Sequence, residues 1–380
     1  MKVPFFRPQI GEAEIAEVVD SLRNGWLTTG PKTIAFEKAF IEYLGDTTLH
    51  AVAVNSATAG LHLALEALAI GPGDEVIVPT YTFTATAEVV RYMGAEPVFV
   101  DVDYKTLNIS IDSVRMAITP RTKAIMPVHF AGLSCDMDAL ITLARARDIA
   151  IVEDAAHALP THYRGRRIGT LDTSAAIFSF YANKTITTGE GGMLVTRHKH
   201  IAERAQKMRL HGLDRDAIDR FKTGRWAYDV IGPGFKYNMT DIASSIGIHQ
   251  LVRAETFRTE RAELARRYTE RLFSLPLDLP TEAEAPDGHA WHVYVIRVRP
   301  EAKLTRDQLF EKLLERGIVC SVHYTPLHKF SYWKDRYSLS AQNFPNAERA
   351  FEGALTLPLF PGMSDAEFDY VVESLSDLLR

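Results

Sequence analysis

The chain alternates short apolar runs with stretches of helical period between residues 50 and 154. The apolar runs are 51–54, 75–79, 97–100, 123–130 and 149–154, and the intervening stretches of helical spacing lie at 58–70, 89–93, 111–118 and 137–146. This alternation is typical of an α/β domain with a mostly parallel sheet whose two faces are covered by helices. In such sheets ligands bind beyond the carboxyl ends of the strands, so polar residues at those ends are the first functional candidates.

The rest of the chain extends this pattern at both ends. Before the alternation, helical spacing at 15–22 and 34–44 predicts two helices joined by the loop 25–31, which is either a plain connection or a ligand contact. After it, the sequence predicts strands at 175–178, 194–195, 292–298 and 318–324, and helices at 201–210, 240–266, 304–317 and after residue 364. We expect a large domain over 1–250 and a smaller α/β domain over 251–380. Segment 211–238 lacks a clear period and is predicted to be an ordered active-site loop.

Composition excludes several classes of function. The 380 residues are 46% hydrophobic and 24% charged with a net charge of -5, which is ordinary for a globular chain and gives no electrostatic footprint for nucleic acid. No GxGxxG motif follows a predicted strand, no P-loop motif occurs, and the histidines have no metal-ligand spacing, so we assign no metal. The first residues contain no long apolar core, so we expect neither a signal peptide nor a membrane span. Cys135 and Cys320 are expected to be free thiols in a reducing cytoplasm.

Two predicted strands end in residues that could contact a ligand. The first is followed by Asn55, Ser56, Ala57 and Thr58 at the start of a helix, where free amides and the helix dipole favour an anion. Ser56 or Thr58 could equally be a simple helix cap. The second strand is followed by aromatic residues up to Phe83, on which a flat cofactor could stack, although such aromatics are more often part of the core.

Asp154 and Lys184 form the most informative pair. Asp154 ends an apolar strand, where a carboxylate is costly unless it is paired. Lys184 follows another strand among hydroxyl and glycine residues, a setting that suits a phosphorylated carbonyl compound because an amine can form a Schiff base. A pyridoxal phosphate enzyme needs both groups, with the carboxylate on the pyridine nitrogen. Separately, Asp154 could be a helix cap or an ion-pair partner, and Lys184 a surface lysine.

Several motifs, in order along the chain, resemble one protein family. They are NSATAGLHLAL, GDEVIVPTYTFTAT, PVHFAG, IVEDAAHA, FSFYANKTITTGEGGM and GFKYNMTDIASSIG. In this order they resemble the DegT/DnrJ/EryC1/StrS sugar aminotransferases, which are fold-type I pyridoxal phosphate enzymes, and the likeness extends nearly end to end, over 6–361. Within the family the chain is most similar to enzymes that aminate C4 of a nucleotide-linked 4-keto sugar, especially the type that forms UDP-4-amino-4-deoxy-L-arabinose, through GWLTTGP, TPRTKAI, KYNMTDI and HAWHVYVIRV.

The resemblance implies a role for individual residues. Lys184 matches the Schiff-base lysine and Asp154 the carboxylate on the pyridine nitrogen. The other cofactor positions are Ala57, Thr58 and Ser179 at the phosphate, Phe83 stacked on the ring, His157 near the ring, and Asn238 reaching the cofactor phosphate of the neighbouring subunit. The active sites of a homodimer would therefore be shared. The region near the substrate would include Thr29, His323, Tyr324 and His328.

Two residues depart from the family pattern. Ala57 stands where many relatives have glycine, so one backbone amide would approach the phosphate less freely. Pro160 stands where glycine is common and could reshape the loop behind the cofactor. Neither change touches Asp154 or Lys184, so we expect it to alter substrate fit and not the type of chemistry.

The implied reaction has two halves. An amino acid donor, expected to be L-glutamate, converts pyridoxal phosphate to pyridoxamine phosphate, and the keto sugar then takes up the amine. Alternatives are a C3 aminotransferase, a pyridoxamine phosphate-dependent sugar dehydratase, in which histidine typically replaces the lysine, and a sensor or regulator that keeps the fold. The sequence leaves open the nucleotide, the sugar and whether the product enters lipid A, an O-antigen, a glycoprotein or an antibiotic.

Overall fold

A seven-stranded sheet forms the centre of the computed structural model, which describes residues 1–214 and 227–380. Its strands are β1 (His50–Val54), β2 (Glu75–Pro79), β3 (Glu96–Val100), β4 (Thr122–Ile125), β5 (Ala150–Asp154), β8 (Ala175–Ser179) and β9 (Gly192–Thr196). Their order is β1-β9-β8-β5-β4-β2-β3, and only β9 is antiparallel to its neighbours. The predicted α/β fold with a mostly parallel sheet is confirmed.

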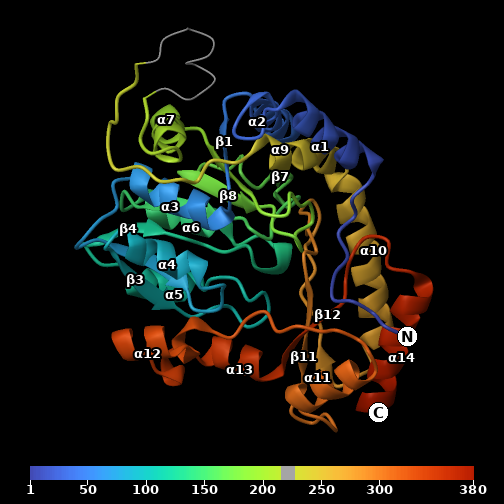
Figure 1. Ribbon diagram of the computed structural model, residues 1–380. Coiled ribbons are helices and arrows are strands. Elements are labelled where there is room, and N and C mark those ends of the chain that lie inside the picture. The colour runs from blue at the N-terminus through green and yellow to red at the C-terminus, as the bar shows by residue number, and fades with distance from the viewer. Residues whose placement is uncertain (215–226) are drawn as a thin grey trace.

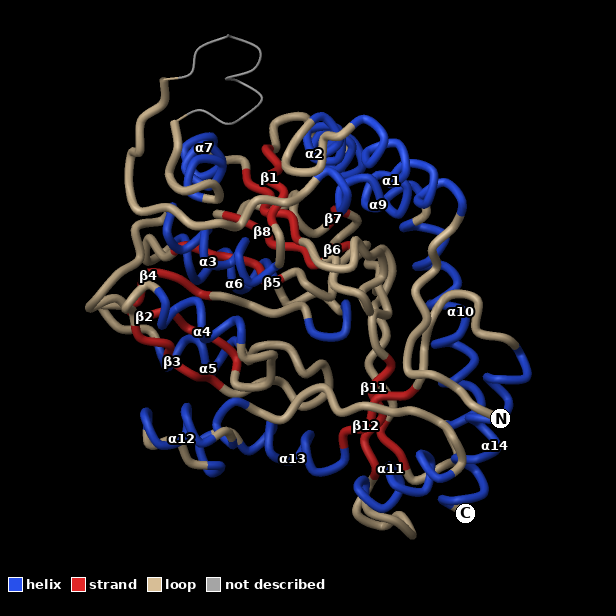
Figure 2. The backbone as a smooth tube through the Cα atoms, in the orientation of Figure 1, coloured by secondary structure: helices blue, strands red, loops and turns tan. Residues whose placement is uncertain are grey.

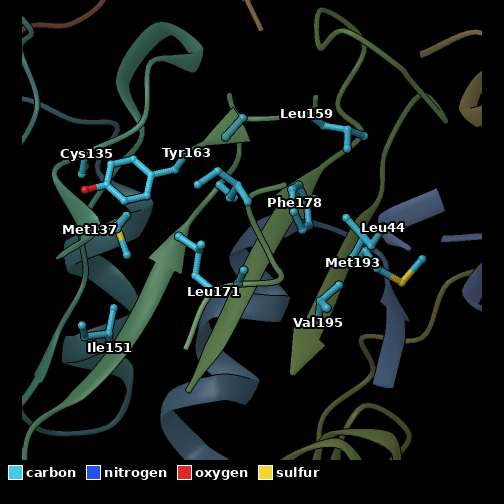
Figure 3. Packing of buried hydrophobic residues seen from close by; sticks show 14 of the residues in the cluster. Leu44, Cys135, Met137, Ile151, Leu159, Tyr163, Leu171, Phe178, Met193 and Val195 are labelled. Atoms are coloured by element: carbon cyan, nitrogen blue, oxygen red, sulfur yellow. The ribbon is translucent and has the colours of Figure 1, made fainter. Parts of the chain in front are cut away.

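Helices cover both faces of this sheet (Figure 1). One face carries α3 (Ala57–Ala67), α4 (Ala85–Tyr92) and α7 (Lys199–Met208), and the other carries α2 (Pro31–Leu44), α5 (Ile111–Ala117) and α6 (Met137–Arg145). Figure 3 shows part of the core on the face that carries α2, α5 and α6, where Phe178 on β8 and Met193 and Val195 on β9 lie among buried apolar side chains. Because both faces are buried, these strands are apolar throughout and do not alternate between apolar and polar residues.

Three further helices pack at the β1 edge or lead away from it. They are α1 (Glu12–Asn24), α9 (Asp241–Val252) and α10 (Ala254–Leu272). Gly25 and Gly45 end α1 and α2 in the left-handed conformation, which glycine adopts without steric cost. The buried Asp241 carboxylate, at the start of α9, accepts hydrogen bonds from the amides of Gly30 and Thr33 at the start of α2. The two helix starts are thereby fixed to each other.

The C-terminal part has its own small sheet and core, visible beside α10 and α14 in Figure 2. The sheet contains β10 (Leu277–Asp278), β11 (Tyr294–Val298) and β12 (Ala354–Leu357), and the helices around it are α11 (Arg306–Glu315) and α14 (Asp365–Leu379). Val3 belongs to the same core and forms a bridge with Ile318, so the N-terminal residues lie against the C-terminal part. We propose the domain boundary near residue 250, close to the junction of α9 and α10.

Two more helices return from the small sheet to the large one. They are α12 (Ser331–Tyr337) and α13 (Pro345–Gly353). The Trp333 ring packs on Phe99 of β3 with ring centroids 5.5 Å apart. The Asp101 carboxylate accepts hydrogen bonds from the amides of Asn346 and Ala347 at the start of α13. The remaining elements are the hairpin of β6 (His162–Tyr163) and β7 (Arg166–Arg167) and the short 3-10 helices Phe130–Gly132, Leu327–Lys329 and Ala341–Asn343.

The structure corrects several predicted elements. The single helix over 240–266 is two helices separated at Arg253, whose guanidinium contacts the Gln9 carbonyl and Glu14, and periodicity cannot reveal such a tertiary contact. Segment 318–324 is not a strand, because it makes only isolated bridges. The strand expected over 123–130 ends at Ile125, and its last residues form a loop. Of the loop expected over 211–238, residues 215–226 lie outside the described part of the chain. No helix of the described residues is long and apolar enough to cross a bilayer.

Candidate active site

A cavity of about 470 Å³ opens at the carboxyl ends of the large sheet's parallel strands. Ten of the residues named from the sequence line it, namely Ser56, Ala57, Thr58, Phe83, Asp154, His157, Ser179, Lys184, His323 and Tyr324. The volume lies within the range of small-molecule sites. The position is the one expected for ligands of an α/β sheet.

Lys184 follows β8 in a tight turn, in which its amide donates a hydrogen bond to the Tyr181 carbonyl. Its amine nitrogen Nζ lies 3.4 Å from Nε2 of His292. Burial lowers the pKa of the Lys184 amine to about 8, and the negative charge of Asp154 opposes that shift. Roughly a tenth of this amine is therefore uncharged at pH 7, far more than for an ordinary lysine, and a nucleophile or base requires the uncharged form.

Asp154 is the last residue of β5 and is 5% exposed. Burial raises the pKa of its carboxyl group, while hydrogen bonds from the Thr86 hydroxyl (2.7 Å) and the Ala156 amide (3.2 Å) act in the opposite direction. The Thr86 hydroxyl donates its proton to Asp154, so its oxygen accepts a hydrogen bond from the Thr82 hydroxyl, 3.1 Å away. Two hydroxyl groups thus orient a carboxylate that lines the cavity.

His157 is held in one tautomer. Its Nδ1 accepts a hydrogen bond from the Ala131 amide at 3.2 Å, so the proton of the neutral ring is on Nε2, which lies 2.9 Å from the Tyr324 hydroxyl oxygen. Burial, then the positive charge of Lys184, lowers the pKa of His157 well below its usual value. The Nε2 proton is donated to Tyr324, which leaves the Tyr324 hydroxyl hydrogen free to point elsewhere. Ala131 adopts a φ of 58°, a left-handed conformation that costs a non-glycine residue about 1 kcal/mol.

The start of α3 also lines the cavity. The Ser56 hydroxyl caps the helix by accepting a hydrogen bond from the Ala59 amide, and Ala57 and Thr58 line the cavity in the first turn. A helix cap and an anion site can therefore exist together, because the cap binds only the Ala59 amide and the other amides of the first turn remain for an anion. Gly192 of β9 lies directly against this turn, since a Cβ there would be 2.7 Å from the Ala57 nitrogen.

The cavity's aromatic side combines a side chain after β2 with the C-terminal part. Phe83 is 58% exposed, and its ring centroid lies 6.0 Å from that of Tyr324. His323 is buried with Nδ1 2.9 Å from the Thr356 hydroxyl, and burial lowers its pKa to about 4. Burial also raises the pKa of Tyr324, so the side chains at 323 and 324 are both neutral at physiological pH.

Three of the predicted residues do not line the cavity. The Asn238 side-chain amide donates to the Thr29 hydroxyl at 2.8 Å, and Thr29 donates to the Met239 carbonyl at 2.6 Å, so these two residues form a separate cluster. His328 has both ring nitrogens engaged, Nδ1 with the Thr80 hydroxyl at 2.8 Å and Nε2 with Glu348 at 2.7 Å. This geometry leaves His328 no ring nitrogen for a substrate.

Sequence reasoning did not single out Thr86 or His292 as site residues. Thr86 lies one helical turn beyond Thr82, and a threonine buried at the start of a helix near a strand-end carboxylate is a usable signal. His292 belongs to the quoted motif HAWHVYVIRV, where a polar residue directly precedes an apolar strand. The sequence could not show that this segment crosses to Lys184, because the contact joins residues 108 positions apart.

The arrangement fits a phosphorylated pyridine aldehyde. Lys184 supplies an amine for the aldehyde, Asp154 a buried carboxylate that a protonated ring nitrogen would neutralise, and the start of α3 with Ser179 a site for the phosphate. No three His, Cys, Asp or Glu side chains come together as a metal-ligand set in residues 1–214 or 227–380.

Comparisons with known proteins agree with this geometry. The family model of the DegT/DnrJ/EryC1/StrS aminotransferase family matches residues 8–376. The chain is 44% identical over 382 residues to the spore coat polysaccharide biosynthesis protein SpsC of Bacillus subtilis, covering 100% of this chain and 97% of SpsC. It is 45% identical over 379 residues to an uncharacterised protein of Methanocaldococcus jannaschii, covering 99% and 97% of the two chains.

A solved structure shows the same fold along the whole chain. Spr1654 of Streptococcus pneumoniae, assigned as a sugar aminotransferase and solved in its PMP form, superposes with a TM-score of 0.93 and 37% identity, covering 99% of each chain. Its PLP form superposes with a TM-score of 0.92. Since the family model spans nearly the whole sequence, the chain belongs to the DegT/DnrJ/EryC1/StrS aminotransferase family.

Proposed function

We propose that this chain is a pyridoxal phosphate-dependent aminotransferase that moves an amino group from L-glutamate to the C4 keto carbon of a nucleotide-linked sugar. The observation that carries the proposal is the pairing of Lys184, an amine with a lowered pKa, and Asp154, a buried carboxylate, in one cavity. The sequence features that resemble C4 aminotransferases support the position of amination, and the names of SpsC and Spr1654 support a sugar acceptor.

Each side of the cavity would have a separate task. Pyridoxal phosphate, when bound, supplies an aldehyde that combines with amines and a ring that withdraws electrons from the reacting carbon. Asp154, oriented by Thr86, would keep the ring nitrogen protonated. Amides at the start of α3 and the Ser179 hydroxyl would bind the phosphate, and Phe83 would stack on the ring.

Lys184 would bind the cofactor and then transfer the proton. Once an amino acid has displaced it, its free amine is the one lysine amine that lines the cavity among the described residues. A pKa of about 8 allows this amine to take a proton from the donor carbon and return it, because both protonation states are accessible near neutral pH.

We propose a homodimer with shared sites. Asn238 and Thr29 lie together outside the cavity of their own chain, an arrangement compatible with a role in the site of a second copy. Phe83 and Tyr181, which line the cavity, are 58% and 47% exposed in the isolated chain, and a partner subunit could cover them. Two free buried cysteines are compatible with the proposed cytoplasmic location.

An absorbance experiment tests the proposal. Purified protein supplied with pyridoxal phosphate should show the yellow cofactor band, lose it on addition of L-glutamate, and regain it with one member of a panel of UDP- and dTDP-linked keto sugars. Lys184→Ala should abolish turnover, whereas Lys199→Ala, on the exposed surface of α7, should leave it unchanged. A band that glutamate never changes, or a Lys184→Ala variant with wild-type turnover, would contradict the proposal.

A further inference from the structure

His292 is a buried residue whose ring has one hydrogen-bond partner in the described part of the chain, the Lys184 amine. Its side chain is 3% exposed, and Nε2 lies 3.4 Å from Nζ of Lys184. Its other ring nitrogen, Nδ1, has no hydrogen-bond partner among the described residues. Buried polar atoms are usually paired, so a histidine with a single contact of this kind needs an explanation.

The backbone of His292 is fixed on both sides. Its amide donates to the Ala131 carbonyl at 2.9 Å, and its carbonyl accepts from the Arg261 guanidinium at 3.1 Å. The Ala131 amide also binds the His157 ring, so one residue in the left-handed conformation contacts the ring of His157 and the backbone of His292. The two backbone bonds fix the point from which the His292 ring extends toward Lys184.

His157 cannot replace His292 in this contact. The two rings are adjacent, with centroids 4.3 Å apart, but both nitrogens of His157 are already engaged by the Ala131 amide and the Tyr324 hydroxyl. His292 therefore has the available ring nitrogen next to the lysine. Burial, and then the charge of Lys184, lowers the pKa of His292 well below its usual value, so the ring is neutral.

A neutral imidazole can pair with an amine in either protonation state. Its nitrogen lone pair accepts a hydrogen bond from an ammonium, and in the other tautomer its N–H donates to an uncharged amine. A lysine that must gain and lose a proton needs such a partner, because a carboxylate would favour the charged form alone. His292 is not among the residues that line the cavity, so it would act through Lys184 and not on the substrate.

We propose that His292 is a positioning residue that holds the Lys184 amine whenever this amine is free, and so keeps it at the edge of the cavity between proton transfers. The inference rests on the proposed function, because only a reaction that releases the lysine requires a holding group. The contact itself is a property of the cofactor-free chain and can be tested without turnover.

The first test follows the histidine ring nitrogens by NMR. Long-range proton-nitrogen spectra of the cofactor-free protein, with 15N-labelled histidine, are recorded from pH 6 to pH 10, and His292→Gln assigns the signal. We expect the Nε2 shift of His292 to change with a midpoint near the Lys184 pKa of about 8, and to stay constant in Lys184→Met. The titratable groups that interact with Lys184, namely Asp154, His157 and His323, are all retained in this variant.

His157 and His289 are internal controls in the same spectra. His157 is adjacent but engaged elsewhere, so a purely electrostatic effect would move His157 and His292 equally. His289 is buried in the same segment, with Nδ1 bound by the Trp291 amide, and should not respond. Equal changes in His157 and His292, or no change in His292, would overturn the proposal.

The second test uses two amide replacements in the cofactor-loaded enzyme. Glutamine places its terminal amide near the position of Nε2, whereas asparagine reaches only the position of Nδ1. We expect His292→Asn to lower kcat about tenfold, the effect of one lost hydrogen bond in the transition state, with KM for the donor within about twofold, and His292→Gln to restore most of the loss. His289→Gln should leave kcat unchanged.

The two proposals fail differently. If the protein never transaminates, the proposed function fails, while the NMR response of His292 still shows whether the contact exists. If transamination is normal and His292→Asn keeps wild-type kcat, the holding role is wrong although the function stands. If the His292→Asn variant does not fold, the NMR comparison of wild type with Lys184→Met still decides whether His292 contacts the Lys184 amine.

Discussion

The cavity has two walls that are built in different ways. The strand wall consists of residues that end a strand of the large sheet, lie in the loop after it or begin the next helix, and its members are Ala57, Thr58, Asp154, Ser179 and Lys184. The C-terminal wall consists of His323 and Tyr324, which line the cavity, and His292 behind them. On the first wall the sheet itself determines position, whereas on the second the residues are placed by contacts with segments far away in the sequence.

This difference separates two kinds of task. The strand wall carries the charged groups, the amine and the carboxylate, on a scaffold buried on both faces. The C-terminal wall carries neutral groups whose partners are Thr356, His157 and Lys184. We therefore expect substitutions on the strand wall to act on the chemical step, and substitutions of the cavity-lining C-terminal residues to act mainly on substrate affinity.

The largest expected effect is that of Asp154→Asn. An amide of the same size keeps the shape of the site but cannot hold a ring nitrogen in the protonated form. Removing a charge aimed at the reacting system should lower kcat about 10²-fold to 10³-fold with little change in folding stability. Steady-state kinetics with glutamate and the keto sugar measure this, with urea denaturation to compare stability. A variant within about twofold of wild type would show that the strand wall does not act through this carboxylate.

Lys184→Met should stabilise the cofactor-free chain in a pH-dependent way. The pKa of the folded-state amine is lowered from 10.5 to about 8, so burying the charge costs stability. Below pH 8 the amine is protonated in both the folded and the unfolded chain, and the full loss of stability is present. Between pH 8 and 10.5 this loss becomes smaller, because the amine of the folded chain releases its proton first. The shift corresponds to about 3 kcal/mol. Urea denaturation should show the variant more stable than wild type by up to that amount at pH 7, with the difference disappearing toward pH 10.5. A constant difference across this range would contradict the prediction.

The two walls also differ in how far the sequence predicts them. Asp154 and Lys184 could be paired from sequence because each lies just after an apolar run, and parallel strands bring such positions to one edge. The resemblance to a known family added Asn238, His323 and Tyr324 as positions near a site. What no pattern could supply was the position of the segment before β11 next to Lys184. There the His292 amide donates a hydrogen bond to the Ala131 carbonyl, and the His292 carbonyl accepts one from Arg261.

Tyr324→Phe should have a smaller effect that appears in affinity. The Tyr324 hydroxyl accepts a hydrogen bond from His157 and has its own hydrogen free for a ligand in the cavity. Losing one such donor should raise KM for the keto sugar about tenfold, with kcat changed by less than about threefold. Kinetics with the sugar as the varied substrate measure this, and Tyr332→Phe, at an exposed position, is the matched control. A loss confined to kcat would contradict the division between the two walls.

His328→Gln should have the smallest effect on activity, although the sequence places this residue near the substrate. Both ring nitrogens of His328 are engaged, by Thr80 and by Glu348, and the ring stacks on Phe344 with centroids 4.7 Å apart. Glutamine can form a hydrogen bond with one of these partners but not with both, so the free energy of unfolding should fall by about 1–2 kcal/mol. Because the residue does not line the cavity, kcat and KM should remain at wild-type values below the unfolding temperature. A raised KM for the keto sugar in a variant of unchanged stability would instead establish a substrate contact at 328, and would extend the C-terminal wall beyond the residues that line the cavity of a single chain.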